Sequence, residues 1–481
     1  MLFNSLEFIL IFLPLCVVGF YLAARLSQRL AIALLLLFSL IFYGVWNPIY
    51  LLLLGGSIIA NYALGQCLQR NPSKMLAALG VSANLLSIAY FKYMDFFIET
   101  VNQALSLSLP LQHIILPLGI SFFTFQQISY LVECYKGSIK EKDFLSYALF
   151  VSFFPQLIAG PIVRFQEISY QFLSKSFGQL DWNKVILGLI VFTIGLSKKV
   201  LLADNAAYYA SDVFARAEYG LDINTAYTWF GVFAYSFQIY LDFSAYSDMA
   251  IGLALMLGLK LPVNFLSPYK SKDIISFWRT WHITLSKFLR DYLYIPLGGN
   301  RHGKNRRYIN LMLVMLIGGL WHGASFNFVI WGGLHGLYLI INHLSNYIAK
   351  RRGKELLPNN ALKIAVTFLA VTLAWIFFRA ETFQGALHIY MNLLPITLQD
   401  ALELIISLPI YMAMLLPQII LIWCLPNTIY IKERLETALQ KASGLKEPRV
   451  FIPYILTALG LAMSIFYIFA GVYSEFIYFQ F

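Results

Sequence analysis

The sequence predicts an all-α integral membrane protein that crosses the bilayer many times. Hydrophobic residues make up 59% of the 481 positions and charged residues only 12%, which is more apolar surface than one soluble core can bury. Long uncharged runs reach the roughly 20 residues that a helix needs to span a bilayer. Basic residues gather in the short loops between these runs. We therefore expect a polytopic fold in contact with the lipid bilayer, with roughly 11–13 membrane segments.

The apolar segments follow one another with no internal repeat and no Pro/Ser-rich linker, so we expect one integral domain over residues 1–481. The first segment, residues 8–24, lacks the basic start and the small-residue cleavage site of a signal peptide, and we expect it to be a retained span. Helix-breaking residues interrupt later segments, as in FFPQLIAGP at 153–161. Some segments are therefore predicted to be broken or re-entrant, which is tolerated where protein or a wet cavity covers the backbone.

The net charge of +11 lies in short loops, where it reports orientation under the positive-inside rule and does not point to nucleic-acid binding. The N-terminus and the turn at 46–49 are predicted to face outside. The basic loops predicted to face the cytoplasm are 25–29, 136–142, 299–307 and 349–355. Because basic loops flank residues 308–349 at both ends, this stretch is predicted to be a hairpin with arms at 310–330 and 331–348.

The stretch NLMLVMLIGGLWHGASFNFVIWGGLHG at 310–336 places His322 inside an apolar run. A polar ring at membrane depth is costly unless it faces a protein interior or a water-filled cavity. The glycine pairs at 318–319 and 332–333 remove side chains where backbone or ligand must come close. This pattern indicates a cavity wall that contains an imidazole. The alternative is a packing histidine that is bonded to a neighbouring carbonyl.

The segment SFWRTWHITLSKFLRDY, residues 276–292, is predicted to be an interfacial amphipathic helix on the cytoplasmic membrane surface. At about 100° per residue, its large apolar side chains fall on one side. Arg279, Lys287 and Arg290 fall on the opposite side. These cations either meet lipid headgroups or bind the phosphates of a cytoplasmic donor such as a coenzyme. His282 lies at the border of the two faces, where it could point into a shared cavity.

Other polar residues in apolar surroundings are expected to have mainly structural roles. Asp242 and Asp248 do not share a helical face, so we expect each to bond a neighbouring helix, with a proton relay as the alternative. No metal site is expected, because His322 and His335 lack a zinc-type spacing and no third ligand is evident. His335 is predicted to pack against a neighbouring span. No G-x-S-x-G elbow occurs, so a general-base imidazole is the most economical chemistry.

FWRTWHITLSKFLRDYLYIPLGGNRHGKNRRYINL followed by GGLWHGASFNFVIWGGLHG resembles the membrane-bound O-acyltransferase family, in particular its bacterial polysaccharide branch, which includes alginate O-acetylation membrane proteins. The resemblance continues upstream in FPQLIAGPIVRF and YLDFSAYSDMAIGLALMLG. It covers nearly the whole chain and is most specific at 277–336, the predicted catalytic core region. Two departures could alter the pocket. Ser325-Phe326 stands where an Asn-Trp pair is expected, and Thr280 stands where a basic residue is common.

The resemblance implies a helical funnel or tunnel through the membrane, with His322 as the catalytic histidine and His282 at a second, less uniform position. It also implies a cytoplasmic thioester donor, acetyl-CoA in this branch, and a hydroxyl acceptor that is reached from the other side. The predicted chemistry is proton abstraction from the acceptor by His322, with an acyl-imidazole relay as the competing form.

The predicted function is therefore O-acetylation of an exported polysaccharide such as alginate, by a multi-pass acetyltransferase of the bacterial cytoplasmic (inner) membrane. The resemblance also implies an extracytoplasmic partner that handles the acetyl group. Two alternatives stay open at this point: D-alanyl transfer to teichoic acid from a carrier-protein thioester, and a non-enzymatic transporter. The sequence does not identify the acceptor.

Overall fold

The computed structural model describes residues 1–140, 142–353, 357–395, 397–441, 448–471 and 474–477. Residue 141 and residues 354–355 of the predicted cytoplasmic loops lie outside this set. The regular structure within it is helical throughout, with no strand among the described ranges. Seven helices are long and apolar enough to cross a membrane, or up to 8 if one bent pair counts as a span. The predicted all-α polytopic fold is confirmed.

Long helices begin the chain, and shorter ones follow in the region that the sequence marks with helix breakers. The π-helical turn η1 (Phe8–Phe12) continues into α1 (Leu13–Leu26) as one helix of 19 residues, and the other long helices are α2 (Gln28–Gly44), α3 (Tyr50–Arg70) and α4 (Lys74–Leu105). The shorter ones are α5 (Ile120–Tyr135), α6 (Phe144–Ser152), α7 (Phe154–Leu157) and α8 (Phe165–Phe172). Gly119 precedes α5 in the left-handed conformation, and α6 ends just before Pro155. The predicted interruptions are thus confirmed.

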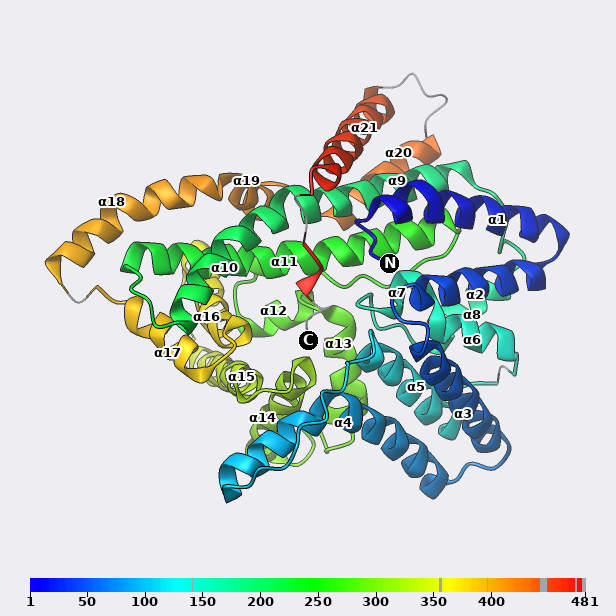
Figure 1. Cartoon of the computed structure of the whole chain (residues 1–481), viewed down its shortest axis with the longest axis horizontal. Helices are drawn as coiled ribbons and strands as arrows, with labels where there is room; N and C mark the ends of the chain where they lie inside the picture. Colours follow the sequence, from blue (N-terminus) through cyan, green and yellow to red (C-terminus); the bar gives the residue numbers. More distant parts are fainter. Residues whose placement is uncertain (141, 354–356, 396, 442–447, 472–473, 478–481) are drawn as a thin grey trace.

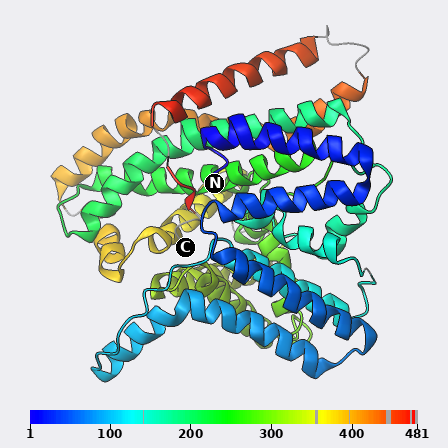
Figure 2. The same ribbon diagram turned by 45° about the vertical axis from the view of Figure 1, so that its right-hand side comes forward.

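The central helix of the molecule is α11 (Thr225–Met256), and nearly all of its side chains are buried. Beside it run α9 (Trp182–Ser197), the π-helical turn η2 (Lys198–Ala203) and α10 (Asp204–Glu218) (Figures 1 and 2). A Cβ built on Gly188 would lie 2.6 Å from the carbonyl oxygen of Gly252. The backbones of α9 and α11 therefore approach as closely as small residues allow.

Separate buried ion pairs join η2 to α11. The Nζ atom of Lys199 lies 2.6 Å from Asp242 and 2.8 Å from Asp204. The Nζ atom of Lys198 lies 2.5 Å from Asp248. Each aspartate therefore has its own lysine on a neighbouring helical element. The prediction that Asp242 and Asp248 bond neighbouring helices is confirmed.

The predicted hairpin is formed by α14 (Gly303–His322) and α15 (Phe326–Arg352). Its turn lies at 323–325, so the predicted boundary between the two arms at residue 330 was wrong. Ser325 sets the start of α15, because its side chain accepts a hydrogen bond from the backbone N–H of Asn327 at 3.2 Å. Serine is a favoured N-cap residue. The apolar residues on both sides of it form one run, so hydropathy alone does not locate the turn.

The glycines of the hairpin bring its two helices together. A Cβ on Gly319 would lie 2.2 Å from the carbonyl oxygen of Phe328 and 3.1 Å from Gly332. A Cβ on Gly333, by contrast, would meet only Leu316 at an ordinary 3.5 Å. Of the two uses that the sequence leaves open for these glycines, close backbone approach is the one observed at Gly319 and Gly332.

The segment at 276–292 is broken, so the prediction of one continuous amphipathic helix was wrong. It consists of α12 (Ile274–Thr280), α13 (Ile283–Leu289) and a π-helical turn, η4 (Arg290–Tyr294). At the break, His282 is left-handed with φ 41°, and the N–H of Ile283 donates to the carbonyl of Asn264 at 3.0 Å. The apolar side, including Trp281, is buried within the protein and does not form a lipid-facing surface.

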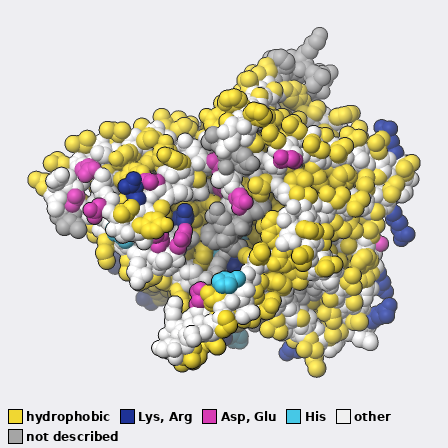
Figure 3. Space-filling model, in the orientation of Figure 1, with side chains coloured by type: hydrophobic (Ala, Val, Ile, Leu, Met, Phe, Trp, Pro, Cys, Tyr) yellow, Lys and Arg dark blue, Asp and Glu magenta, His cyan; other side chains and the backbone are white. Residues whose placement is uncertain are grey.

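The remaining helices are η3 (Pro268–Lys270), α16 (Asn360–Arg379), α17 (Phe383–Asn392), α18 (Leu398–Met414), α19 (Leu416–Ile419), η5 (Ile420–Cys424), α20 (Thr428–Lys441) and α21 (Pro448–Phe469). They pack against the elements described above, with α16 on α15, α18 on α11 and α21 on α9. Exposed leucine and isoleucine side chains line α18 and α21, and hydrophobic side chains dominate the face in Figure 3. This surface suits lipid acyl chains.

Candidate active site

His322 is the last residue of α14, at the point where the hairpin turns. The helix ends there because Gly323 has an extended backbone, and α15 starts only at Phe326. The His322 side chain is buried, with 3% of its surface exposed. His322 lies three residues beyond the close α14–α15 contact at Gly319, and its side chain lines a cavity.

A cavity of about 240 Å³ has His322 in its wall. The wall also contains Lys92 of α4, Trp46 of the α2–α3 turn and Phe122 of α5. Trp46 belongs to the turn that the positive-inside rule predicts to face outside, so the cavity is bounded partly by residues of the predicted outer side. As the sequence indicates, the imidazole lines a cavity.

Aromatic rings cover the other sides of the His322 imidazole. The ring centroid of Trp321 lies 4.9 Å away, and those of Trp331 and Phe378 each lie 5.1 Å away. All three rings are steeply inclined to the imidazole, at 67–85°. Such edge-to-face packing restricts the rotation of the imidazole and leaves its cavity side as the accessible one.

His282 is fully buried at the break between α12 and α13. Its Nδ1 atom lies 3.1 Å from Oδ1 of Asn264. The same oxygen accepts hydrogen bonds from the N–H and hydroxyl of Thr284, at 3.3 and 2.9 Å. Because Oδ1 acts as an acceptor, Nδ1 of His282 carries the proton and Nε2 is the basic nitrogen of the ring.

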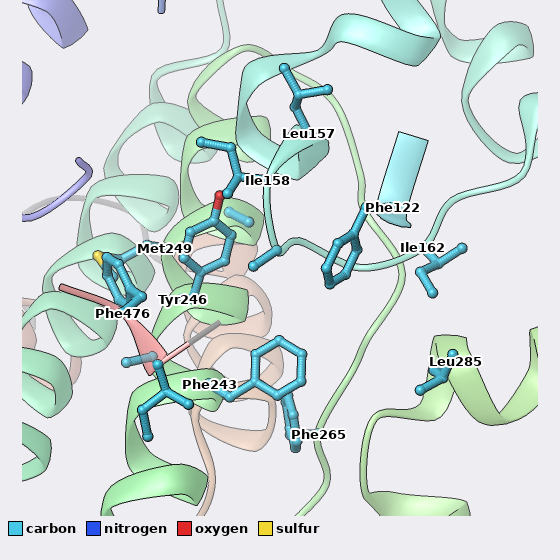
Figure 4. Close-up of a cluster of buried hydrophobic side chains, with 14 of the residues drawn as sticks. Phe122, Leu157, Ile158, Ile162, Phe243, Tyr246, Met249, Phe265, Leu285 and Phe476 are labelled. Atoms are coloured by element: carbon cyan, nitrogen blue, oxygen red, sulfur yellow. The ribbon is translucent and has the colours of Figure 1, made fainter. Parts of the chain in front are cut away.

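The structure brings His282 and His322 into one region. The indole of Trp321 packs against both, with its ring centroid 6.2 Å from His282 and 4.9 Å from His322. His282 itself is not part of the cavity wall described above. Hydrophobic side chains surround it, and Figure 4 shows this cluster, with Phe122, Phe243 and Phe265 labelled. His282 therefore contacts the His322 site through Trp321, outside the cavity wall.

The predicted donor-binding cations are exposed, but they do not share one helical face. Arg279 lies on α12, Lys287 on α13 and Arg290 on η4, so the break at His282 separates the first from the others. The guanidinium of Arg290 forms an ion pair with Asp291 at 2.7 Å. Lys287 lines a recess of about 20 Å³.

Arg164 joins that small recess to a larger one, of about 360 Å³, which Lys136 also lines. Lys136 begins the predicted cytoplasmic loop at 136–142. The guanidinium of Arg164 forms an ion pair with Asp291 and lies 5.4 Å from the ring of Tyr292. Burial alone would raise the pKa of Asp291, but hydrogen bonds from Arg290 and Arg164 hold this pKa below its usual value. The recess therefore contains a cluster of paired charges.

Sequence reasoning did not single out Lys92 or Arg164. A signal was present for Lys92, because it is a lone cation inside the apolar run of α4, the kind of residue that commonly marks a functional position in membrane proteins. Arg164 gave no comparable signal, because it follows the FFPQLIAGP segment in a loop where a basic residue is ordinary. Its position becomes informative only through its contact with Asp291.

His335 lies on α15 and packs among aromatic rings from α12 and α15. Ring centroids of Trp331 and Trp278 lie 4.8 and 5.2 Å from its own, so the predicted packing role is confirmed. In the part of the chain that the structure describes, no group of three or more His, Cys, Asp or Glu side chains is placed to hold a metal ion.

Comparisons with known proteins agree with these features. Residues 120–380 match the sequence model of the MBOAT, or membrane-bound O-acyltransferase, family. The chain is 44% identical over 420 residues to a peptidoglycan O-acetyltransferase of Helicobacter pylori, covering 81% of this chain and 79% of that protein. It is 41% identical over 400 residues to a probable alginate O-acetylase of Pseudomonas aeruginosa, covering 81% and 74%. Similarity to a teichoic acid D-alanyltransferase of Streptococcus thermophilus is 30% over 283 residues, covering 54% and 68%.

Proposed function

This chain belongs to the membrane-bound O-acyltransferase family, and we propose that it moves acetyl groups from cytoplasmic acetyl-CoA to an acceptor across the bacterial inner membrane, for O-acetylation of an exported polysaccharide such as alginate. Membership makes it an O-acyltransferase and removes the transporter alternative. The observation that supports the two-sided scheme is the placement of His322 in a cavity bounded by Trp46, while the recess around Arg164 contains Lys136 of a predicted cytoplasmic loop.

In the proposed reaction, His322 acts as the general base. Its imidazole accepts the proton of an acceptor hydroxyl while the hydroxyl oxygen attacks the carbonyl carbon of the thioester. The tetrahedral intermediate collapses with cleavage of the carbon–sulfur bond, and the imidazolium returns the proton to the departing sulfur, so that coenzyme A leaves as the thiol. Proton transfer of this kind typically contributes about 10²–10⁴-fold to the rate. An acyl-imidazole intermediate on His322 is the alternative route.

We assign the phosphates of the donor to Arg279, Lys287 and Arg290, and add Arg164. Lys287 and Arg164 line recesses on the predicted cytoplasmic side, and Arg290 is paired with Asp291, which also lines the larger recess. Such cations suit a polyphosphate ligand, because guanidinium groups bind phosphate in a bidentate manner. From this recess, the small cavity lined by Lys287 and Thr284 leads toward the Asn264–His282 pair. His282 is thereby a positioning residue between the donor side and the His322 cavity.

We also propose an extracytoplasmic protein partner that accepts or passes on the acetyl group. The outer connections of this chain are short, such as the turn at 46–49, and offer little from which to build a polymer-binding domain. Protein reconstituted in vesicles is therefore expected to acetylate polymer slowly alone and at full rate only with such a partner. Full-rate acetylation by the isolated protein would contradict the partner.

D-alanyl transfer from a carrier-protein thioester is the nearest alternative within the family. The similarity to the D-alanyltransferase covers 54% of this chain, against 81% for the O-acetyltransferases. The extended match favours acetyl as the transferred group. An assay that offers acetyl-CoA and a D-alanyl carrier protein side by side separates the two donors directly.

The test of the mechanism is the His322→Ala variant, assayed with radiolabelled acetyl-CoA for thiol release and acetyl transfer. We expect transfer to be lost while elution in detergent and the melting temperature stay unchanged, because removing a base affects the transition state more than the fold. His282→Ala is expected to reduce activity without abolishing it. A well-folded His322→Ala protein with near-normal transfer would overturn the proposed role.

A further inference from the structure

The end of α14 that carries His322 is tied to α4 by neighbouring residues. The Nζ atom of Lys92 donates to the carbonyl oxygens of Trp321 at 2.7 Å and His322 at 2.9 Å. The hydroxyl of Tyr93 donates to the carbonyl oxygen of Leu320 at 2.6 Å. The last carbonyl groups of a helix have no partner within that helix. These hydrogen bonds therefore satisfy the open end of α14.

Lys92 is set apart from other lysines of the molecule by its surroundings. It lies within α4, a candidate membrane span, and forms no ion pair among the described residues. A lysine at membrane depth is costly unless it faces protein or a wet cavity. Lys92 meets both conditions: its ammonium group donates to backbone carbonyls of α14, and the residue lines the cavity that contains His322.

We propose that Lys92 is a positioning residue for the transfer reaction, fixing the last turn of α14 so that the His322 imidazole is held at the cavity wall. This inference rests on the proposed role of His322. An ammonium group has three N–H donors, and the carbonyls of Trp321 and His322 take two of them. Lys92 also lines the cavity, so its positive charge is placed to favour the negative charge that develops on the carbonyl oxygen of the tetrahedral intermediate.

A purely structural role for Lys92 is the competing explanation, and Tyr93 provides the matched comparison. Tyr93 ties the same turn of α14 from the same helix, with one neutral hydrogen bond and without being part of the cavity wall. If Lys92 serves only to cap the helix, Lys92→Met and Tyr93→Phe should lower stability and activity in parallel. If Lys92 positions His322 and charges the cavity, only Lys92→Met should reduce turnover strongly.

The experiment measures kcat, the KM for acetyl-CoA and the melting temperature of the full-length protein in detergent. For Lys92→Met we expect a loss of about 10²–10³-fold in kcat, the range seen when one preorganised donor is removed, with KM little changed. Lys92→Arg should recover part of that loss, because it restores a cation with several donors. Tyr93→Phe should stay within a few-fold of the parent kcat.

The outcomes separate this inference from the proposed function. A Lys92→Met protein that keeps its kcat, or that loses kcat only in proportion to a melting temperature lowered equally by Tyr93→Phe, overturns the positioning role. If His322→Ala is inactive in the same series, the base mechanism stands while the Lys92 inference fails. If His322→Ala is active, the proposed mechanism itself fails, whatever Lys92→Met does.

Discussion

The histidines near the cavity have different surroundings, and these surroundings decide what each can do. His322 faces a cavity, and His282 is held by the Asn264 side chain in a defined tautomer. Neither ring nitrogen of His335 has a hydrogen-bond partner among the described residues. The sequence alone separated His322 from His335 by the family resemblance and by spacing. It could not identify Asn264, because that contact joins residues on different segments.

The His335→Phe variant is expected to keep full acetyl transfer and to unfold at the same or a higher temperature. A buried polar group without a partner costs about 1–3 kcal/mol, whereas a phenyl ring fits among the same aromatic rings. Thermal unfolding in detergent and the transfer assay check this, with His322→Phe as the matched control that should lose activity. A stable but inactive His335→Phe protein would place this imidazole in the chemistry.

At the scale of elements, the segment at 276–292 shows what periodicity can and cannot predict. The pattern identified correctly which side is buried, as at Phe277 and Trp281, and which cations are exposed. It did not reveal the break, because the left-handed residue His282 is held by Asn264 from outside the segment. The hairpin of α14 and α15 was likewise predicted, whereas its turn depends on a local N-cap at Ser325.

Replacing Arg279, Lys287 and Arg290 together by glutamine is expected to raise the KM for acetyl-CoA several-fold or more, with a smaller effect on kcat. These cations would bind donor phosphates without touching the reacting carbonyl, so their loss weakens ground-state and transition-state binding alike. Steady-state kinetics at varied acetyl-CoA check this. The control replaces Lys350, Arg351 and Arg352, exposed cations at the end of α15, with the same change in charge. An equal KM effect in both variants would leave only a general electrostatic role.

At the scale of the whole molecule, charge and cavities are distributed in a way that fits two accessible sides. In Figure 3, Lys and Arg side chains gather at the right-hand edge, where the α1–α2 and α3–α4 turns lie in Figure 1. Arg25 and Arg29 flank the first of these turns, and Arg70 and Lys74 flank the second, all at helix ends. The all-α class followed from composition, but the joining of distant segments around α11 did not, because it depends on tertiary contacts that no local pattern encodes.

Cysteine labelling in intact cells should place Asn300, in the basic loop at 299–307, inside, and Ser108, in the connection at 106–119 that contains no Lys or Arg, outside. The exposed Cys67 and Cys424 are first replaced by alanine, because they would react as background, whereas Cys16 and Cys134 are buried. A membrane-impermeant maleimide is then expected to label Ser108→Cys in intact cells, and Asn300→Cys only after the membrane is opened. Labelling of Asn300→Cys in intact cells would reverse the orientation assigned here.

The paired lysines of η2 also constrain how the protein is made. A lysine within a span opposes insertion, by about 2.5–3.5 kcal/mol at its centre, so Lys198 and Lys199 at the end of α9 offset part of what the apolar residues of α9 contribute. Their main partners, Asp248 and Asp242, emerge from the ribosome more than forty residues later, on α11. We therefore expect the α9 segment to integrate stably only after α11 has been made, so that the two enter the bilayer as a neutralised pair. A nascent chain that ends before α11 should fail to integrate α9 in a glycosylation-reporter assay, and stable integration of that fragment would rule out a delayed, joint entry.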